Sequence, residues 1–174
     1  AQSIGKIPVN VDEMNVDLLT IAGHKLYGPK GIGALYVRRG TPLSPVQHGA
    51  GHEGGLRAGT ENTPYIVGLG HAAKLAAKAV DDLTPAMEIM RDRLWDHLHQ
   101  GIPDLTINGH DAPRLPNTLS VNFPHVEGYE LLSRIPELCA STGAACHSGA
   151  THVSATLAAM GVPVERARGA VRLS

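Results

Sequence analysis

Two pairs of neighbouring residues have side chains suited to covalent chemistry. His24 and Lys25 follow an apolar stretch and precede a Gly-Pro turn, where a lysine amine can face a cavity and form a Schiff base. Cys146 lies among small residues, which leave a thiol accessible, and has His147 beside it. A free thiol has a pKa of about 8.5, so a neighbouring cation would raise its small thiolate fraction at pH 7. The sequence therefore offers a candidate amine and a candidate thiol nucleophile.

Two further stretches could hold an anion. Residues 57–62, Arg-Ala-Gly-Thr-Glu-Asn, come just before a helical pattern, so the Thr60 hydroxyl and a guanidinium could hold a phosphate at the helix N-terminus. Arg172 lies on the last strand-like stretch, and its planar guanidinium could bind a carboxylate. From the residues alone, the alternatives are that Thr60 or Asn62 caps the helix and that Arg172 faces solvent.

Simpler uses of the same residue types stay open. Lys25 could be a solvated charge at a strand end, and Cys146 could be a small buried hydrophobic residue. Cys139 lies in an apolar stretch, for which we expect an inert thiol. His48 and His52 lie far in sequence from both cysteines, and the cysteines do not form a close pair. Because a structural zinc site usually shows two close ligand pairs, we expect no metal.

The elements expected in the first part of the chain surround the lysine. Strands are expected at 16–21, as a buried strand, and at 32–37, followed by a long ordered loop over 40–60. Apolar residues at helical spacing predict one helix from Pro64 to Val80. A second helix is expected to start at Thr84 as N-cap, with Pro85 at its first position, and to end near Gly101.

The second part of the chain shows the same alternation of strands and helices. Its elements are expected as strands at 105–107, 118–123 and 170–174, helices at 128–135 and 154–160, and a loop at 141–151. This order predicts an α/β fold with two lobes that divide near residue 78.

Composition excludes several classes of protein. The 174 residues are 43% hydrophobic and 18% charged, which is typical of a globular protein and not of a disordered one. Lys plus Arg total 15 against 16 Asp plus Glu, so a formal charge of -1 gives no attraction to nucleic acid or anionic membranes. The sequence lacks a membrane-length apolar run and a signal-peptide pattern, so we expect a cytoplasmic protein.

The order of these motifs resembles one family across the whole chain. Gln2, His24-Lys25, the 57–62 stretch, the small-residue loop 143–149 and Arg172 follow one another as in the cysteine desulfurases and selenocysteine lyases. These are pyridoxal-phosphate (PLP) enzymes related to the class V aminotransferases. The resemblance implies fold-type I, with residues 1–77 the C-terminal part of the large PLP-binding domain and 78–174 a truncated small α+β domain.

The resemblance also implies a role for each motif. Lys25 is similar to the lysine that binds PLP covalently, and His24 to the residue that stacks on its ring. Gln2 is similar to the glutamine that bonds the phenolic oxygen of PLP, and Thr60 to the residue that reaches the phosphate in the neighbouring subunit of a homodimer. Two further residues are implied to act on the substrate: Arg172 would bind its carboxylate and Cys146 would accept its sulfur.

The function implied is cysteine desulfurase, which converts L-cysteine to L-alanine and leaves a persulfide for iron-sulfur cluster assembly or another sulfur acceptor or scaffold protein. The alternatives are a selenocysteine lyase and an inactive or interaction-only fragment. The chain begins without Met and ends in an alternating stretch, so we expect both ends to be truncated and the 174 residues to be incomplete as an enzyme. The family's aspartate for the pyridinium nitrogen would precede Ala1, and Ala22 stands where many members have a phosphate-binding serine.

Overall fold

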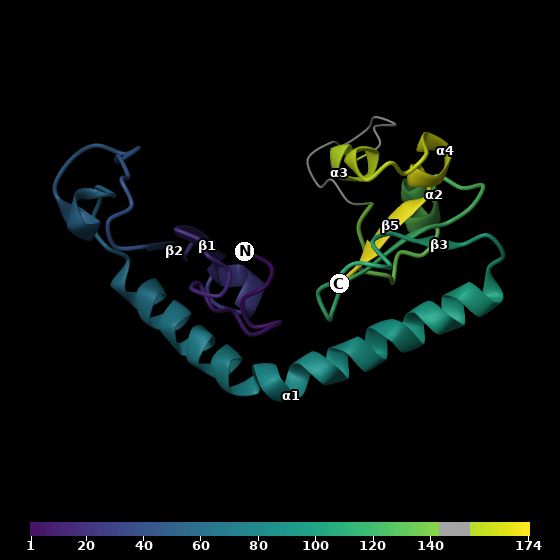
Figure 1. The fold of residues 1–174 in the computed structure, drawn as a ribbon, viewed down its shortest axis with the longest axis horizontal. Helices are drawn as coiled ribbons and strands as arrows, with labels where there is room; N and C mark the ends of the chain where they lie inside the picture. Colours follow the sequence, from purple (N-terminus) through teal and green to yellow (C-terminus); the bar gives the residue numbers. More distant parts are fainter. Residues whose placement is uncertain (143–153) are drawn as a thin grey trace. The chain divides into compact units, whose positions relative to one another are not determined.

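The computed structural model describes residues 1–142 and 154–174, and Figure 1 shows their helices and strands. The described chain divides into two units, Ala1–Leu83 and Thr84–Ser174, with α1 (Thr63–Gly101) running through the boundary. The division near residue 78 expected from the sequence lies in the same helix. Each unit is described separately below.

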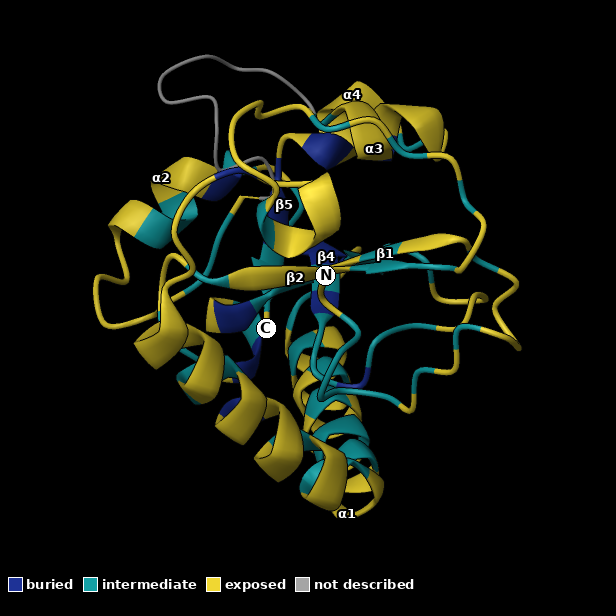
Figure 2. Ribbon diagram, turned by 90° about the vertical axis from the view of Figure 1, so that its left-hand side faces the viewer, coloured by how far each residue is buried: buried dark blue, intermediate teal, exposed yellow. Residues whose placement is uncertain are grey.

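The first unit is built on an antiparallel pair of strands. β1 (Leu18–Ala22) pairs with β2 (Gly33–Val37), with Leu18 opposite Val37 and Ala22 opposite Gly33. Both predicted strands are therefore present, with bounds shifted by one or two residues. The expected burial of the first strand is wrong, because no residue of β1 is fully buried and Leu18 is 43% exposed. Its partner β2 is also largely exposed (Figure 2). No third strand pairs with β1 or β2 in the described chain, so the ribbon has no sheet around it to cover its faces.

Arg38, directly after β2, holds the loop that precedes β1 by hydrogen bonds. Its Nη2 donates to the carbonyl oxygens of Val11 and Val16 at 2.9 and 3.0 Å, and its Nη1 donates to Asp12 Oδ1 at 2.6 Å. The hydrogen bond from the Arg38 guanidinium to the Asp12 carboxylate raises the pKa of Arg38. One guanidinium thus replaces water at two backbone carbonyls that no strand partner satisfies.

The helix α1 differs from its prediction. The sequence predicts two helices, with Thr84 as the N-cap of the second, but the structure has one helix with Pro85 inside it. A proline has no N–H to donate to the carbonyl four residues earlier, yet the remaining turns continue the helix on both sides. Thr84 therefore does not start a helix. In the described part of the chain, no helix is both long and apolar enough to cross a membrane.

The second unit contains a three-stranded antiparallel sheet. Its order is β3 (Thr106–Ile107), β4 (Leu119–Asn122) and β5 (Ala170–Leu173), all at positions that the sequence predicts. Because side chains of paired residues lie on the same face, the register separates a polar face from an apolar one. The apolar face holds the core residues Leu119 and Val121, which pack with Leu105 and with Trp95 and Leu98 of α1.

Three short helices lie between β4 and β5 in sequence. α2 (Gly128–Ser133) and α3 (Ala155–Ala159) shorten the helices predicted at 128–135 and 154–160, and α4 (Val164–Ala167) was not expected from the sequence. Leu157 of α3 and Ala167 of α4 form a second small core with Ala170 of β5. α4 spans one turn, which is too short for apolar periodicity to reveal it. The 3-10 helices η1 (Gly23–Leu26) and η2 (His52–Gly55) were also not expected.

Gly169 allows β5 to approach the end of β4. The Phe123 N–H donates to the Gly169 carbonyl at 2.9 Å, and a Cβ at Gly169 would overlap the Phe123 carbonyl. A substitution therefore has to move the backbone of one strand. By contrast, Gly101 at the end of α1 has open space where a Cβ would lie.

We expect Gly169→Ala to lower the free energy of unfolding by about 1–3 kcal/mol, because the added methyl group overpacks a backbone contact. Urea denaturation followed by tryptophan fluorescence measures this, since Trp95 packs on the sheet core. The matched control is Gly101→Ala, which should change stability by less than about 1 kcal/mol. Equal effects of the two substitutions would contradict the role of Gly169.

We expect Arg38→Lys to loosen residues 11–17, because an ammonium group is not a planar fork that reaches two carbonyls and a carboxylate together. Hydrogen exchange of the Val16 amide, which donates to the Val11 carbonyl at 3.2 Å, should become faster. The exposed neighbour provides the control: Arg39→Lys should leave this exchange rate unchanged. An unchanged rate in Arg38→Lys would show that the loop is held by other contacts.

Candidate active site

Lys25 lies in the turn that joins the two strands of the first unit. The turn is η1, in which His24 is exposed and Lys25 is half-buried above the buried Leu26. Among the described residues, no carboxylate forms an ion pair with Lys25. A half-buried amine without a carboxylate partner is suited to covalent bonding with a carbonyl group.

Close backbone packing fixes the shape of this turn. The Gly23 N–H donates to the Ile32 carbonyl at 2.9 Å, and the Gly28 N–H donates to the Gly23 carbonyl at 2.9 Å. A Cβ at Gly23 would lie 2.8 Å from the Ile32 oxygen, so only glycine fits there. Tyr27, with φ of 63°, ends the turn in the left-handed region. The position of Lys25 therefore follows from the backbone on both sides of it.

The N-terminal segment that carries Gln2 reaches the same turn. The Lys6 ammonium lies 4.8 Å from the centre of the Tyr27 ring, and a Cβ at Gly5 would lie 3.8 Å from the Leu26 Cβ. Gln2 itself is exposed. The structure thus brings the segment of Gln2 against the turn of Lys25, within one unit.

Thr60 lies outside the helix that follows it. Asn62 caps α1, because its carbonyl accepts from the Tyr65 and Ile66 N–H groups at 3.0 and 2.9 Å. Its side-chain oxygen is 3.4 Å from the Tyr65 nitrogen. The capping alternative for Thr60 is therefore wrong and that for Asn62 is confirmed. The exposed Thr60 hydroxyl has no hydrogen-bond partner among the described residues.

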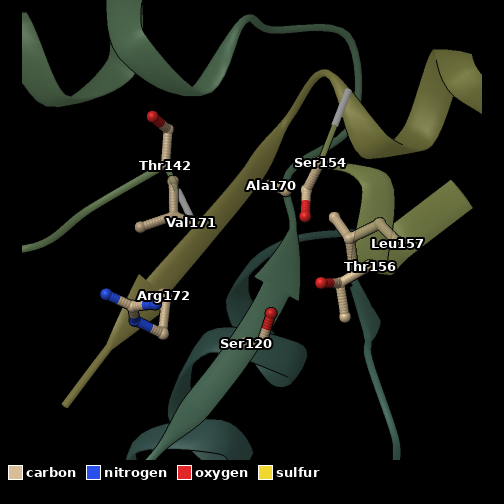
Figure 3. Close-up of a pocket in the computed structure, with 8 residues that line it drawn as sticks. All are labelled: Ser120, Thr142, Ser154, Thr156, Leu157, Ala170, Val171 and Arg172. Atoms are coloured by element: carbon tan, nitrogen blue, oxygen red, sulfur yellow. The ribbon is translucent and has the colours of Figure 1, made fainter. Parts of the chain in front are cut away.

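The second unit contains a cavity of about 180 Å³ next to Arg172. Its lining is Ser120, Thr142, Ser154, Thr156, Leu157, Ala170, Val171 and Arg172, all shown in Figure 3. Four of these residues bring hydroxyl groups and one brings a guanidinium. A cavity with one cation and several hydroxyl groups can bind a small anion such as a carboxylate.

Backbone pairing on both sides holds Arg172. Arg172 is opposite Ser120 of β4, and on its other side it forms a bridge with Ser141. The Arg172 N–H donates to the Ser141 carbonyl at 2.7 Å, and the Ser141 N–H donates to the Arg172 carbonyl at 3.1 Å. The expectation that Arg172 simply lies on a strand is thus confirmed, and the strand borders a cavity.

The predicted site residues fall into three groups. Gln2, His24, Lys25 and Thr60 belong to the first unit, and Arg172 belongs to the second. Cys146 and His147 lie outside the described residues. Cys139, which we expected to be inert in an apolar stretch, is an exposed free cysteine. No group of three or more potential metal-ligating side chains is found in residues 1–142 and 154–174.

Sequence reasoning missed the hydroxyl groups of the cavity. Ser120 could have been found from the alternation of its strand, because it is a polar residue between the apolar Leu119 and Val121. This alternation places Ser120 on the face opposite the core. Thr142 comes directly before residues 143–153, Ser154 comes directly after them, and Thr156 lies in α3. No pattern in the sequence connects these three residues with Arg172.

Comparison with known proteins identifies the family. The model of the family described as aminotransferase class-V matches residues 1–174. A cysteine desulfurase of Nostoc sp. is 46% identical over 175 residues, which are 99% of this chain and 44% of that protein. A cysteine desulfurase IscS of Methanosarcina thermophila is 44% identical over 99% of this chain and 43% of its own length. The chain therefore spans less than half the length of these relatives.

Solved structures show the same fold. The NifS-like protein of Rickettsia africae matches with a TM-score of 0.88 and 30% identity, over 99% of this chain and 46% of that protein. SspA in complex with cysteine matches with a TM-score of 0.76 and 35% identity, over 100% of this chain and 48% of SspA. The predicted fold class, part of a fold-type I transferase, is confirmed by these matches. The chain belongs to the class-V aminotransferase family.

Proposed function

We propose that this chain is the part of a PLP-dependent cysteine desulfurase that supplies the cofactor lysine, the carboxylate-binding arginine and the sulfur-accepting thiol. The observation that carries the proposal is the lining of the Arg172 cavity. Thr142 and Ser154, the two residues that flank the segment containing Cys146, both line it. Cys146 is four residues along the chain from Thr142, and four residues span at most about 14 Å. A substrate carboxylate at Arg172 would thus lie within reach of the segment that carries the thiol.

The residues of the first unit fit PLP. The Lys25 amine has no carboxylate partner among the described residues and would hold the cofactor covalently. His24, exposed beside it, would stack on the ring, and Gln2 would bond the phenolic oxygen. Thr60, with its hydroxyl outside the helix cap, would contact the phosphate across a homodimer. When bound, PLP supplies electron withdrawal from the α-carbon of an amino acid.

The chain's own residues would then perform the sulfur transfer. Arg172 would bind the carboxylate of L-cysteine and orient its Cβ–S bond toward the thiol. Lys25 would move protons at the substrate carbons, because a free lysine amine can accept and donate a proton. Cys146 would take the sulfur as an S–S bond forms and the Cβ–S bond breaks, while Cβ gains a proton to become the methyl group of L-alanine.

The relatives favour cysteine over selenocysteine as the substrate. The similar proteins are named cysteine desulfurases, and one solved neighbour holds cysteine. Some are named IscS, which supports iron-sulfur cluster assembly as the destination of the sulfur. A sulfur acceptor or scaffold protein would receive it in the cytoplasm. That the 174 residues alone are incomplete as an enzyme remains a prediction.

We expect PLP to be attached to Lys25, because the η1 backbone presents this amine without a competing carboxylate. The measurement is borohydride reduction of the full-length protein that contains this chain, with PLP bound, followed by peptide mapping by mass spectrometry. Lys25→Ala should remove the pyridoxyl label. Lys30→Ala, at an exposed lysine five residues along the same loop, should retain it. A label on Lys30, or spread over the surface lysines, would contradict the assignment.

In the full-length protein that contains this chain, we expect Cys146→Ala to abolish persulfide formation from L-cysteine while PLP stays bound, because sulfur removal needs a thiolate acceptor. Cys139→Ala, at the exposed second cysteine, is the matched control and should behave as wild type. Mass spectrometry detects the persulfide, and visible absorption detects the cofactor. With selenocysteine, which ionises more readily, Cys146→Ala should retain much of the alanine production. Equal losses with both substrates would show that the thiol is required for either element.

A further inference from the structure

The polar face of the three-stranded sheet contains a closed pair of side-chain amides. Asn108 Nδ2 donates to Asn122 Oδ1 at 3.0 Å, and Asn122 Nδ2 donates to Asn108 Oδ1 at 2.8 Å. Asn122 is only 3% exposed, so its amide must find its partners inside the protein. Its second donated bond goes to Thr106 Oγ1 at 3.1 Å. The second donated bond of Asn108 goes to Ser120 Oγ at 3.0 Å.

These bonds determine what the Ser120 hydroxyl can still do. An amide nitrogen donates and does not accept, so Ser120 Oγ is the acceptor of the bond from Asn108 and keeps its own proton. In the described part of the chain, Ser120 Oγ has no second hydrogen-bond partner. Ser120 also lines the cavity (Figure 3). The hydroxyl is therefore held by Asn108 with a proton to donate at the cavity wall.

The sheet register places Ser120 beside the arginine of the same cavity. Ser120 and Arg172 are opposite residues of β4 and β5, so their side chains leave the sheet on the same face. The backbone of Asn108 continues this arrangement, because its N–H donates to the Ser120 carbonyl at 2.8 Å. A ligand at Arg172 thus has the Ser120 hydroxyl next to it. Asn108 holds the Ser120 backbone through its own N–H and holds the hydroxyl through its side-chain amide.

We infer that Ser120 is a specificity-determining residue of the Arg172 cavity, whose hydroxyl donates a hydrogen bond to the carboxylate of a bound amino acid. Asn108 is the positioning residue, since it acts through Ser120. The inference rests on the proposed function, in which Arg172 binds the substrate carboxylate. Arg172 supplies charge, whereas Ser120 supplies a directed donor that a carboxylate accepts well and a carboxamide accepts less strongly.

The test compares L-alanine with L-alaninamide as ligands of the 174-residue chain. Titrations followed by the backbone amide signals of residues 119–122 and 170–173 give a Kd for each ligand and variant. We expect Ser120→Ala to raise the Kd of L-alanine at least about tenfold, the size of one hydrogen bond to a charged group, and to change that of L-alaninamide less than about twofold. Ser120→Thr, which keeps a hydroxyl, should restore most of the alanine affinity.

The role of Asn108 is tested against the other end of the same network. Asn108→Ala should raise the Kd of L-alanine in the wild-type background and add nothing in the Ser120→Ala background. Thr106→Val removes the other partner of Asn122 but lines no part of the cavity, so it should lower Tm without changing either Kd. This control separates loss of stability from loss of positioning.

The possible failures are distinguishable. If Arg172→Ala abolishes L-alanine binding and Ser120→Ala does not weaken it, the proposed function stands and the inference is wrong. If Ser120→Ala raises both Kd values equally, Ser120 has only a structural role and the inference is also wrong. If wild type shows no alanine-dependent shifts, or Arg172→Ala leaves them unchanged, the carboxylate role of Arg172 fails and the inference fails with it.

Discussion

The strand register of the second unit is the constraint on which the Arg172 cavity depends. β5 is held between β4 and the bridge to Ser141, so Arg172 is opposite Ser120 on one side and bonded to Ser141 on the other. A slip of one residue would turn the arginine to the face that packs on α1 and place an apolar neighbour in the cavity. Burial of Leu119 and Val121 therefore fixes the polar face as firmly as it fixes the core.

In the first unit, backbone geometry positions the candidate residue Lys25, and the surrounding strands are much less buried than those of the second unit. None of the residues of β1 and β2 is fully buried, and the turn between the two strands is shaped by hydrogen bonds at Gly23 and Gly28. A Cβ at Gly28 would lie 3.5 Å from Ala72 Cβ on α1, so the turn also rests on the helix. Lys25 is thus positioned by backbone hydrogen bonds and by close packing at two glycines.

The sequence allowed each strand of the described residues to be located, because the apolar residues of these strands alternate or form short runs bounded by glycine and proline. It did not reveal how they are covered. The strand around Leu18 reads as buried because its residues are apolar, but burial depends on neighbouring strands that periodicity does not encode. The break expected at Thr84 follows from a sound capping signal, and the continuation of α1 through Pro85 overrides it.

Candidate site residues could be predicted from the sequence where the residue type alone suggests a chemistry. They could not be predicted where the role of a residue depends on a hydrogen-bond partner far away in sequence. Lys25 and Arg172 stand out in the sequence as an amine after a strand and a guanidinium on a strand. Asn108 and Asn122 are 14 positions apart, and only the register makes them a pair.

The two kinds of residue also differ in how they take part in the packing of the fold. Lys25, Thr60 and Arg172 belong to neither core cluster. Asn122 is buried and bonded on both sides, so a substitution there leaves several polar groups without partners. The residues that we propose for the chemistry thus lie outside the cores, whereas the amide pair is tied to the stability of the sheet. A change of ligand at the cavity is therefore easier to reach through Ser120, at the edge of the network, than through the asparagines that hold it.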